Sequence, residues 1–454
     1  MQTTQERGLW SSKLGFVLAA AGSAVGLGNI WKFPSEVADN GGAAFLVVYI
    51  LCCFIVGFPV MVAELAIGRK TRRNPVGAFK VLSGGKGPWF LIGGWGILCG
   101  IFILSFYLVV AGWTLSFVVA EIAKMFGAEA LYTTLSTISP GVKTAIFTVL
   151  FMVGTVGIVL GGVAAGIERA TKTLMPALIG MLLVMIGFVL TRDGAMTGLT
   201  EYLKPDLGDL NTTVIFSAMA QAFFSLSLGM GALITYGSYL DEKESIPEAA
   251  ALVTTADFSI AFLAGLLIMP AMYVAQGAGI EIINPDTGAL INSDTLVFAV
   301  LPQLFDAMGG LIGVIFGFAF FVLLSMAALT STISLLEVPV SFGIDELKLE
   351  RRKSTLLFGI LIGAIAVVVS FNFSLIGHFD LIFNQIGLPL GGFMICIFLA
   401  YVWTLRGAFT EMESGYPGVA TSTFGKVWSV FVRFICPLLI LLVFITTVWT
   451  ALGL

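Results

Sequence analysis

The chain has 454 residues, of which 58% are hydrophobic and 11% charged, and its formal net charge is −4. A mean hydropathy of +1.02 excludes a water-soluble domain and indicates a polytopic membrane protein. The single histidine, His378, nearly excludes a histidine-based metal or catalytic site, and the five cysteines lie in apolar runs without CxxC spacing. We therefore expect no catalytic residues and no enzyme.

Eleven hydrophobic runs are long enough to cross a bilayer. They cover residues 13–37, 43–68, 88–120, 144–162, 166–190, 214–240, 254–277, 311–342, 354–372, 379–405 and 427–452. The polar segment 1–12 lacks the apolar core and cleavage site of a signal peptide, so the first run is expected to direct insertion. The sequence predicts one all-α membrane transport domain over residues 1–454.

The distribution of Lys and Arg predicts the orientation of the spans. With the N-terminus inside, seventeen Lys and Arg residues fall in cytoplasmic connections and four fall outside. We expect a multi-pass protein of the cell inner (plasma) membrane, with a cytoplasmic N-terminus and an extracytoplasmic C-terminus. The acidic connection from about 278 to 310 contains a short apolar stretch, Thr295 to Leu304, and is expected to be a structured external loop near the mouth of a pathway.

The first span is interrupted at mid-depth by the sequence GSAVGLGN, residues 22–29. Glycine costs about 1 kcal/mol relative to alanine in a helix interior. An unwound turn is tolerated in a bilayer only where its backbone lines a cavity or meets a ligand, so this stretch predicts a site for a cation and a small zwitterion. The alternative is that Gly22 and Gly26, four residues apart, only allow close helix packing.

A second interruption favours the binding-site interpretation. The sixth run contains SLSLGMG, residues 225–231, five spans after the first break. Paired broken helices at corresponding positions indicate an inverted repeat with a substrate site at the midplane. We expect the first repeat at 13–190, the inverted second repeat at 214–405, and an eleventh helix at 427–452.

Charged residues at bilayer depth need a partner or a function. Lys32 and Asp380 both lie near the outer face and would close an outer vestibule as an ion pair; the alternative is two separate interfacial charges. Glu64 is expected to accept hydrogen bonds from unwound backbone. Asp257 in the seventh span offers the fixed negative charge that a buried monovalent cation requires.

Neutral oxygens could complete such a cation site. Ser225 could supply a hydroxyl, Asn29 an amide oxygen and Ala24 a freed carbonyl. Thr330 and Ser331 form a second oxygen pair, although hydroxyls in membrane helices usually bond to their own carbonyls.

Eight ordered motifs extend over nearly the whole chain. They are RGLW (7–10), GSAVGLGNIWKFP (22–34), NGGAAFLVVY (40–49), AELAIGR (63–69), SFYLVVAGWTL (105–115), QAFFSLSLGMGALITYGSY (221–239), ALTST (328–332) and DELK (345–348). In these motifs the chain resembles the neurotransmitter:sodium symporter family, in particular its bacterial eleven-span amino-acid transporters of the LeuT, MhsT and Tyt1 type. The resemblance implies the LeuT-type fold, a 5+5 inverted repeat with broken helices 1 and 6 plus an eleventh span.

The resemblance also implies two sodium sites. The first sodium would bind the substrate carboxylate together with the Ala24 carbonyl, Asn29, Ser225 and Asp257. The second would bind the carbonyls of Gly22, Val25 and Ala327 and the hydroxyls of Thr330 and Ser331. We expect the partners to be sodium, an amino acid and the lipid bilayer, and no nucleic acid.

The implied substrate site lies between the two breaks. The carboxylate would meet Leu27, Gly28 and Tyr107, and the ammonium would meet Ala24, Phe224, Ser225 and Ser227. The side-chain pocket would be lined by Ile103, Tyr107, Phe224, Met230, Ser331 and Leu335. In the implied outer gate, Phe224 and Tyr107 form a thin lid and Lys32 and Asp380 form an ion pair. The implied inner gate contains Arg7, Trp10, Ser238, Tyr239 and Asp345.

Single residues refine the implied substrate. Family members that carry monoamines have an aspartate at the position of Gly26, so a glycine there implies a substrate with its own carboxylate. Met230 can repack around large side chains, which predicts a hydrophobic or aromatic L-amino acid. In chloride-dependent relatives an anion lies near positions matching Tyr49, Gln221 and Ser225. Asp257 would replace that charge, and we therefore expect chloride independence.

Some residues depart from the family pattern or keep two interpretations. Lys32 stands where arginine is usual, which removes a bidentate contact to Asp380, and Ser35 replaces a common tyrosine. Gly166 and Pro176 reproduce a spacing suggested to let the fifth span unwind; the alternative is an ordinary proline kink.

The predicted function is sodium-coupled symport of an amino acid by alternating access. The alternative of the same fold is a transport-inactive, sodium-dependent amino-acid sensor. A channel is disfavoured because the polar groups cluster at the midplane between two gates.

Overall fold

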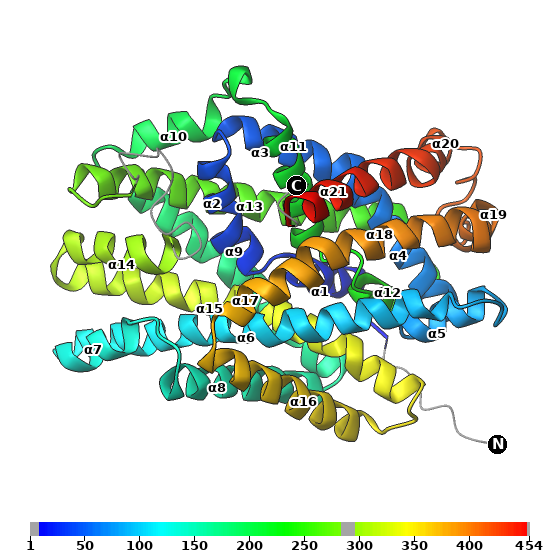
Figure 1. Cartoon of the computed structure of the whole chain (residues 1–454), viewed down its shortest axis with the longest axis horizontal. Coiled ribbons are helices and arrows are strands. Elements are labelled where there is room, and N and C mark those ends of the chain that lie inside the picture. Colours follow the sequence, from blue (N-terminus) through cyan, green and yellow to red (C-terminus); the bar gives the residue numbers. More distant parts are fainter. Residues whose placement is uncertain (1–8, 283–295, 452–454) are drawn as a thin grey trace.

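The computed structural model describes residues 9–282 and 296–451. Each helix in these two ranges lies in a predicted hydrophobic run or in a connection between two runs, and these ranges contain no strand. In Figure 1 the long helices run roughly along the longest axis of the molecule. Helices α5 (Pro75–Leu82), α19 (Leu405–Met412) and α20 (Thr423–Val430) lie at one end, and α7 (Glu129–Ser136), α10 (Ala195–Leu203) and α14 (Leu296–Met308) lie at the other.

Nine continuous helical segments of the described ranges are long and apolar enough to cross a membrane. They are Ala43–Thr71 (α3, Ala43–Cys52, and α4, Phe58–Thr71), Phe90–Met125 (α6), Val142–Leu160 (α8), Val163–Val189 (with α9, Arg169–Val189), Ile246–Gly277 (α13), Gly310–Asp345 (α15), Arg351–Phe371 (α16), Ser374–Met412 (α17, Ser374–Phe379; α18, Gly387–Ile397; α19) and Thr423–Ala451 (α20 and α21, Cys436–Ala451).

The first predicted run is a broken helix. Helix α1 (Lys13–Ala24) ends at Val25, whose backbone is extended, and a π-helical turn, Gly28–Lys32, leads into α2 (Phe33–Asp39). The two halves are bent by 51°. Ser12 starts α1 by accepting a hydrogen bond from the Gly15 N–H. Counted as one span, this pair brings the spans that pass the length and hydropathy test to ten.

The predicted run 214–240 consists of two short helices, α11 (Thr212–Ser225) and α12 (Ala232–Gly237). The connecting residues have left-handed backbone at Ser227, Gly229 and Gly231, with φ of 54°, 82° and 80°. A Cβ at Gly229 would lie 2.2 Å from the Leu388 carbonyl oxygen, so both conformation and space require glycine there. The break therefore results from local sequence and from close contact with α18.

Several helices extend beyond the predicted runs. Helix α6 continues past residue 120 to Met125, and α13 begins at Ile246, eight residues before the predicted start at 254. The hydropathy pattern ends a run near its first charged side chain, but the helix continues into the interface. Glu121 and Lys124 of α6 and Glu248 of α13 are examples. The short apolar stretch of the external loop forms α14; its first predicted residue, Thr295, lies outside the described residues.

Helix α6 is the central element of the scaffold. It packs against α15, α8, α16 and α18, while α1 packs against α13, α15 and α9. Helix α12 packs closely on α4, because glycines lie at their contact: a Cβ at Gly68 would be 2.0 Å from the Ile234 carbonyl oxygen. These contacts place the two breaks next to each other in the centre of the molecule.

We expect Gly68→Ala to destabilise the fold. The added methyl group would overlap backbone rather than a movable side chain, which costs about 1–3 kcal/mol. The matched control is Gly94→Ala in α6, where a Cβ meets nothing within 4 Å. Thermal unfolding in detergent would measure both. Equal melting temperatures for the two variants would contradict the predicted close contact.

Candidate functional site

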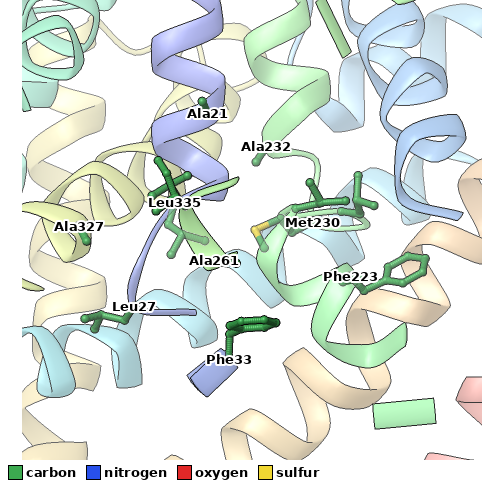
Figure 2. Close-up of a cluster of buried hydrophobic side chains, with 14 of the residues drawn as sticks. Ala21, Leu27, Phe33, Phe223, Met230, Ala232, Ala261, Ala327 and Leu335 are labelled. Carbon is green, nitrogen blue, oxygen red and sulfur yellow. The ribbon is translucent and has the colours of Figure 1, made fainter. Parts of the chain in front are cut away.

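The two breaks, α6 and α15 enclose one central cavity. It is lined by Ser23, Ala24, Gly26, Gly28, Ile103, Tyr107, Phe224, Ser225, Ser227, Met230, Ser331 and Leu335. Ten of the eleven residues predicted to bind substrate are on this wall. The remaining one, Leu27, donates its backbone N–H to the Tyr107 hydroxyl at 2.8 Å. Figure 2 shows the coil that leaves α1 and leads to Leu27, and the loop with Met230 that precedes Ala232.

The cavity has a polar and an apolar part. The Ser227 hydroxyl donates to the Ser23 carbonyl at 3.1 Å, and the Ser331 hydroxyl donates to the same oxygen at 3.5 Å. Ile103, Met230 and Leu335 supply apolar surface. Such a wall suits a small molecule with a polar head and an apolar side chain.

Gly26 keeps the polar part open. A Cβ at this position would lie 2.2 Å from the Ser331 hydroxyl oxygen and 2.6 Å from the Tyr107 hydroxyl oxygen. Any side chain at residue 26 would therefore occupy the space between these two hydroxyls.

Asp257 is the centre of a buried hydrogen-bond cluster next to this cavity. Its side chain is fully buried and accepts hydrogen bonds from Asn29 Nδ2 at 2.7 Å, the Ser225 hydroxyl at 2.8 Å and the Tyr49 hydroxyl at 3.3 Å. The side-chain amide oxygen of Asn29, Oδ1, accepts from the Gly26 N–H at 3.0 Å. A carboxylate, an amide and a hydroxyl are oxygen ligands that suit a hard cation.

The predicted second oxygen group is also assembled. Thr330 Oγ donates to the Val25 carbonyl at 3.2 Å and to the Ala327 carbonyl of its own helix at 2.9 Å. Ser331 Oγ lies 3.5 Å from the Val25 carbonyl. A Cβ at Gly22 would lie 3.3 Å from Thr330 Cβ. Thr330 thus makes both the expected bond to its own helix and a bond across to the first break.

Two residues near the cavity stabilise the broken backbone. Glu64 accepts the Gly229 N–H at 2.7 Å, as predicted for this buried acid. Gln221 Nε2 donates to the Gly28 carbonyl at 2.9 Å. The structure adds Tyr49 and Gln221 to the functional candidates. The sequence predicted for them only a match to positions near the anion of chloride-dependent relatives. A polar side chain inside an apolar run is the signal that could have identified them.

The end of the cavity that is predicted to be the outer one contains the Lys32–Asp380 pair. Lys32 Nζ lies 3.8 Å from Asp380 Oδ2 and 5.0 Å from the centre of the Phe224 ring. Asp380 also accepts hydrogen bonds from Asn384 and Gln385, both at 2.7 Å. The lysine therefore bridges the carboxylate and the aromatic lid.

The opposite end, which is predicted to be the inner one, is closed by aromatic packing. Trp10 donates its indole N–H to the Tyr236 carbonyl at 3.1 Å and its backbone N–H to the Tyr239 carbonyl at 3.3 Å. The Tyr239 hydroxyl donates to Glu337, which forms an ion pair with Arg351 at 2.6 Å. The sequence did not predict the Glu337–Arg351 pair, in which Glu337 is fully buried.

The other predicted inner-gate residues lie nearby on the same end. The Ser238 hydroxyl donates to the Thr235 carbonyl at 2.6 Å, and Asp345 accepts the Asn74 N–H at 2.7 Å. Arg7, also predicted for the inner gate, lies outside the described residues. With both ends closed, the described residues enclose the cavity in the protein interior.

The sequence matches the sodium:neurotransmitter symporter family over residues 7–137 and 124–452. The chain belongs to this family. It is 34% identical over 455 residues to the uncharacterized sodium-dependent transporter YhdH of Bacillus subtilis, covering 97% of each protein. It is 28% identical over 434 residues to sodium-dependent nutrient amino acid transporter 1 of Drosophila grimshawi, covering 80% of this chain and 65% of that protein.

A solved structure shares the fold. The crystal structure of MhsT in complex with L-phenylalanine has a TM-score of 0.84 and 38% sequence identity, and the match covers 97% of this chain and 100% of MhsT. The family resemblance and the LeuT-type fold predicted from the motifs are thereby confirmed. The symporter is a multi-pass membrane protein of a transporter family, not of an enzyme family.

We expect Glu64→Leu to destabilise the symporter more than Glu64→Gln. Leucine would leave the buried Gly229 N–H without an acceptor, at a cost of about 1–3 kcal/mol. Glutamine keeps an acceptor oxygen, and the second oxygen of Glu64 has no hydrogen-bond partner to lose. Thermal unfolding in detergent would compare the two. A glutamine variant as unstable as the leucine variant would contradict this role.

Proposed function

We propose that the protein is a sodium-coupled symporter that carries a hydrophobic or aromatic L-amino acid into the cell by alternating access. The observation that carries this proposal is the central cavity, which combines a polar part between the breaks with apolar surface from Met230, α6 and α15. The 38% identity to MhsT, solved in complex with L-phenylalanine, supports the same class of substrate.

The proposed first sodium site consists of the Ala24 carbonyl, Asn29, Ser225 and Asp257, with the substrate carboxylate as a further ligand. Asp257 would supply the fixed negative charge. In the present arrangement Asn29 directs its NH₂ group to Asp257, so its amide must flip to offer the oxygen to a cation. The proposed second site consists of Gly22, Val25, Ala327, Thr330 and Ser331.

In this proposal the substrate binds by its two charged ends. The carboxylate meets the N–H groups of Leu27 and Gly28, at the start of the outer half-helix, where the helix dipole favours negative charge. The ammonium meets the carbonyls at the ends of α1 and α11. The Tyr107 hydroxyl, which accepts from Leu27, is positioned to donate to the carboxylate.

Coupling follows from the shared ligand. Because the substrate carboxylate completes the first sodium site, each ligand raises the affinity for the other. One sodium gains about 2.3 kcal/mol at 100 mV, and a tenfold gradient adds about 1.4 kcal/mol. Two ions would supply about 7 kcal/mol, enough for an accumulation of about 10⁵-fold. Spans 1, 2, 6 and 7 would move against the remainder, opening one gate at a time.

The excess of Lys and Arg in alternate connections supports a cytoplasmic N-terminus and an extracytoplasmic C-terminus in the plasma membrane. In this orientation Trp10 belongs to the inner gate, and Lys32 and Asp380 belong to the outer gate.

We expect transport to require sodium but not chloride, because Asp257 supplies the negative charge beside the first sodium site. Uptake of L-phenylalanine into proteoliposomes should be unchanged when gluconate replaces chloride. Asp257→Asn should lower the apparent sodium affinity at least tenfold, since a buried charge would be lost. Asp306→Asn, at an exposed acid on α14, is the matched control. Uptake that needs external chloride would contradict the proposal.

We expect large apolar amino acids to compete best for the cavity. In a sodium-dependent binding screen over the twenty amino acids, phenylalanine, tryptophan, tyrosine or leucine should displace a bound ligand. Gly26→Asp should abolish displacement, since its carboxylate would occupy the space of the substrate carboxylate. Displacement by small or charged amino acids alone would refute the predicted selectivity. Binding without uptake would favour a sensor.

A further inference from the structure

A second cavity lies outside the transport site, on the face of the protein between α6 and α18. This groove of about 450 Å³ is lined by Pro88, Trp89, Leu91, Ile92, Trp95, Leu390, Gly391 and Met394. All of its lining side chains are apolar apart from the indole N–H groups. It has the order of volume of one phospholipid acyl chain.

The groove is open toward the lipid. Its walls belong to two membrane-spanning segments, and Leu91 remains 57% exposed. The two helices run antiparallel: the Trp89 ring contacts the Phe398 ring at 5.6 Å, and Trp95 donates its indole N–H to the Gly387 carbonyl at 3.1 Å. The groove therefore begins at the N-terminal end of α6, next to the connection that contains Lys86, and extends toward the middle of the bilayer.

Two lysines precede the Pro88 end of the groove in the chain. Lys86 lies two residues before Pro88, and the Gly85 N–H donates to the Lys80 carbonyl, which brings the Lys80 backbone next to the same connection. Both side chains are exposed, and neither has an ion-pair partner within residues 9–282 and 296–451. An apolar groove close to two lysines that have no ion-pair partner in the described residues is complementary to an anionic lipid.

The second break of the transport site lies behind the α18 wall of the groove. A Cβ at Gly391 would lie 2.2 Å from the Gly229 carbonyl oxygen. A Cβ at Gly96, next to Trp95, would lie 3.0 Å from the Met230 carbonyl carbon. One layer of backbone therefore separates the lipid-facing groove from Met230, whose side chain lines the central cavity.

We propose that this groove binds one anionic glycerophospholipid, with an acyl chain between α6 and α18 and the phosphate near Lys86 and Lys80. The bound chain braces the segment Leu226–Gly231 from the membrane side. Lipid composition then acts on the central cavity without any contact to a ligand in it. This proposal does not depend on which solute the protein carries.

The test uses purified full-length protein and two lipids with identical acyl chains, phosphatidylglycerol and phosphatidylcholine. Native mass spectrometry should show one phosphatidylglycerol retained in preference to phosphatidylcholine. Lys86→Gln and Lys80→Gln should each lower retention of phosphatidylglycerol about fivefold. Lys353→Gln, at an exposed lysine of α16 outside the groove, is the matched control and should change nothing.

Two groove-filling variants test the acyl-chain site. Leu390→Trp and Met394→Trp, one turn apart on α18, should each reduce retention of both lipids. Phosphatidylglycerol should also slow amide hydrogen exchange in Leu226–Gly231 of the wild type, but not in the double lysine variant. Equal retention of the two lipids with no effect of either lysine would overturn the proposal. Unchanged lipid retention in the two tryptophan variants would also overturn the proposal, provided that both variants elute as monodisperse protein.

Discussion

The bilayer offers no water to backbone polar groups, and this constraint governs the rest of the structure. Two stretches at the centre of the protein are not helical, and their N–H and carbonyl groups must find partners in other helices. The Tyr107 hydroxyl accepts the Leu27 N–H, Gln221 donates to the Gly28 carbonyl, and Glu64 accepts the Gly229 N–H. The polar side chains that surround the central cavity therefore also hold the fold together, and backbone groups left over at the breaks can serve a ligand.

The two ends of the cavity are closed by interactions of different kinds. The outer end has one ion pair at 3.8 Å between partly exposed side chains, and exposed pairs contribute about 0–1 kcal/mol. The inner end joins the packed Trp10 ring to Tyr239 and, through it, to the Glu337–Arg351 pair, in which Glu337 is fully buried. Opening the inner end must separate several packed and bonded groups at once. The lysine in place of an arginine at residue 32 makes the outer closure weaker still.

Glycines decide how thin the walls of the site are. Gly391 and Gly96 bring α18 and α6 against the backbone of the second break, and Gly229 fits against the Leu388 carbonyl with left-handed φ. Larger residues at these positions would move the scaffold away from the break. The same close approach brings the lipid-facing groove within one backbone layer of Met230, so the site is not insulated from the membrane by a thick core.

The sequence by itself determined the spans, the two breaks and the family. Hydropathy located the spans because apolar length is a local property, and the glycine clusters at 22–29 and 225–231 marked the breaks because they recur at corresponding positions five spans apart. The family resemblance also predicted that Asp257 and Asn29 lie together. Only the tertiary structure decided the contacts between helices. These are the hydrogen bond from Tyr49 to Asp257, the hydrogen bond from Gln221 to the Gly28 carbonyl, and the Glu337–Arg351 ion pair. A single polar residue in an apolar run reveals that it needs a partner, but the partner is set by how the helices pack against one another.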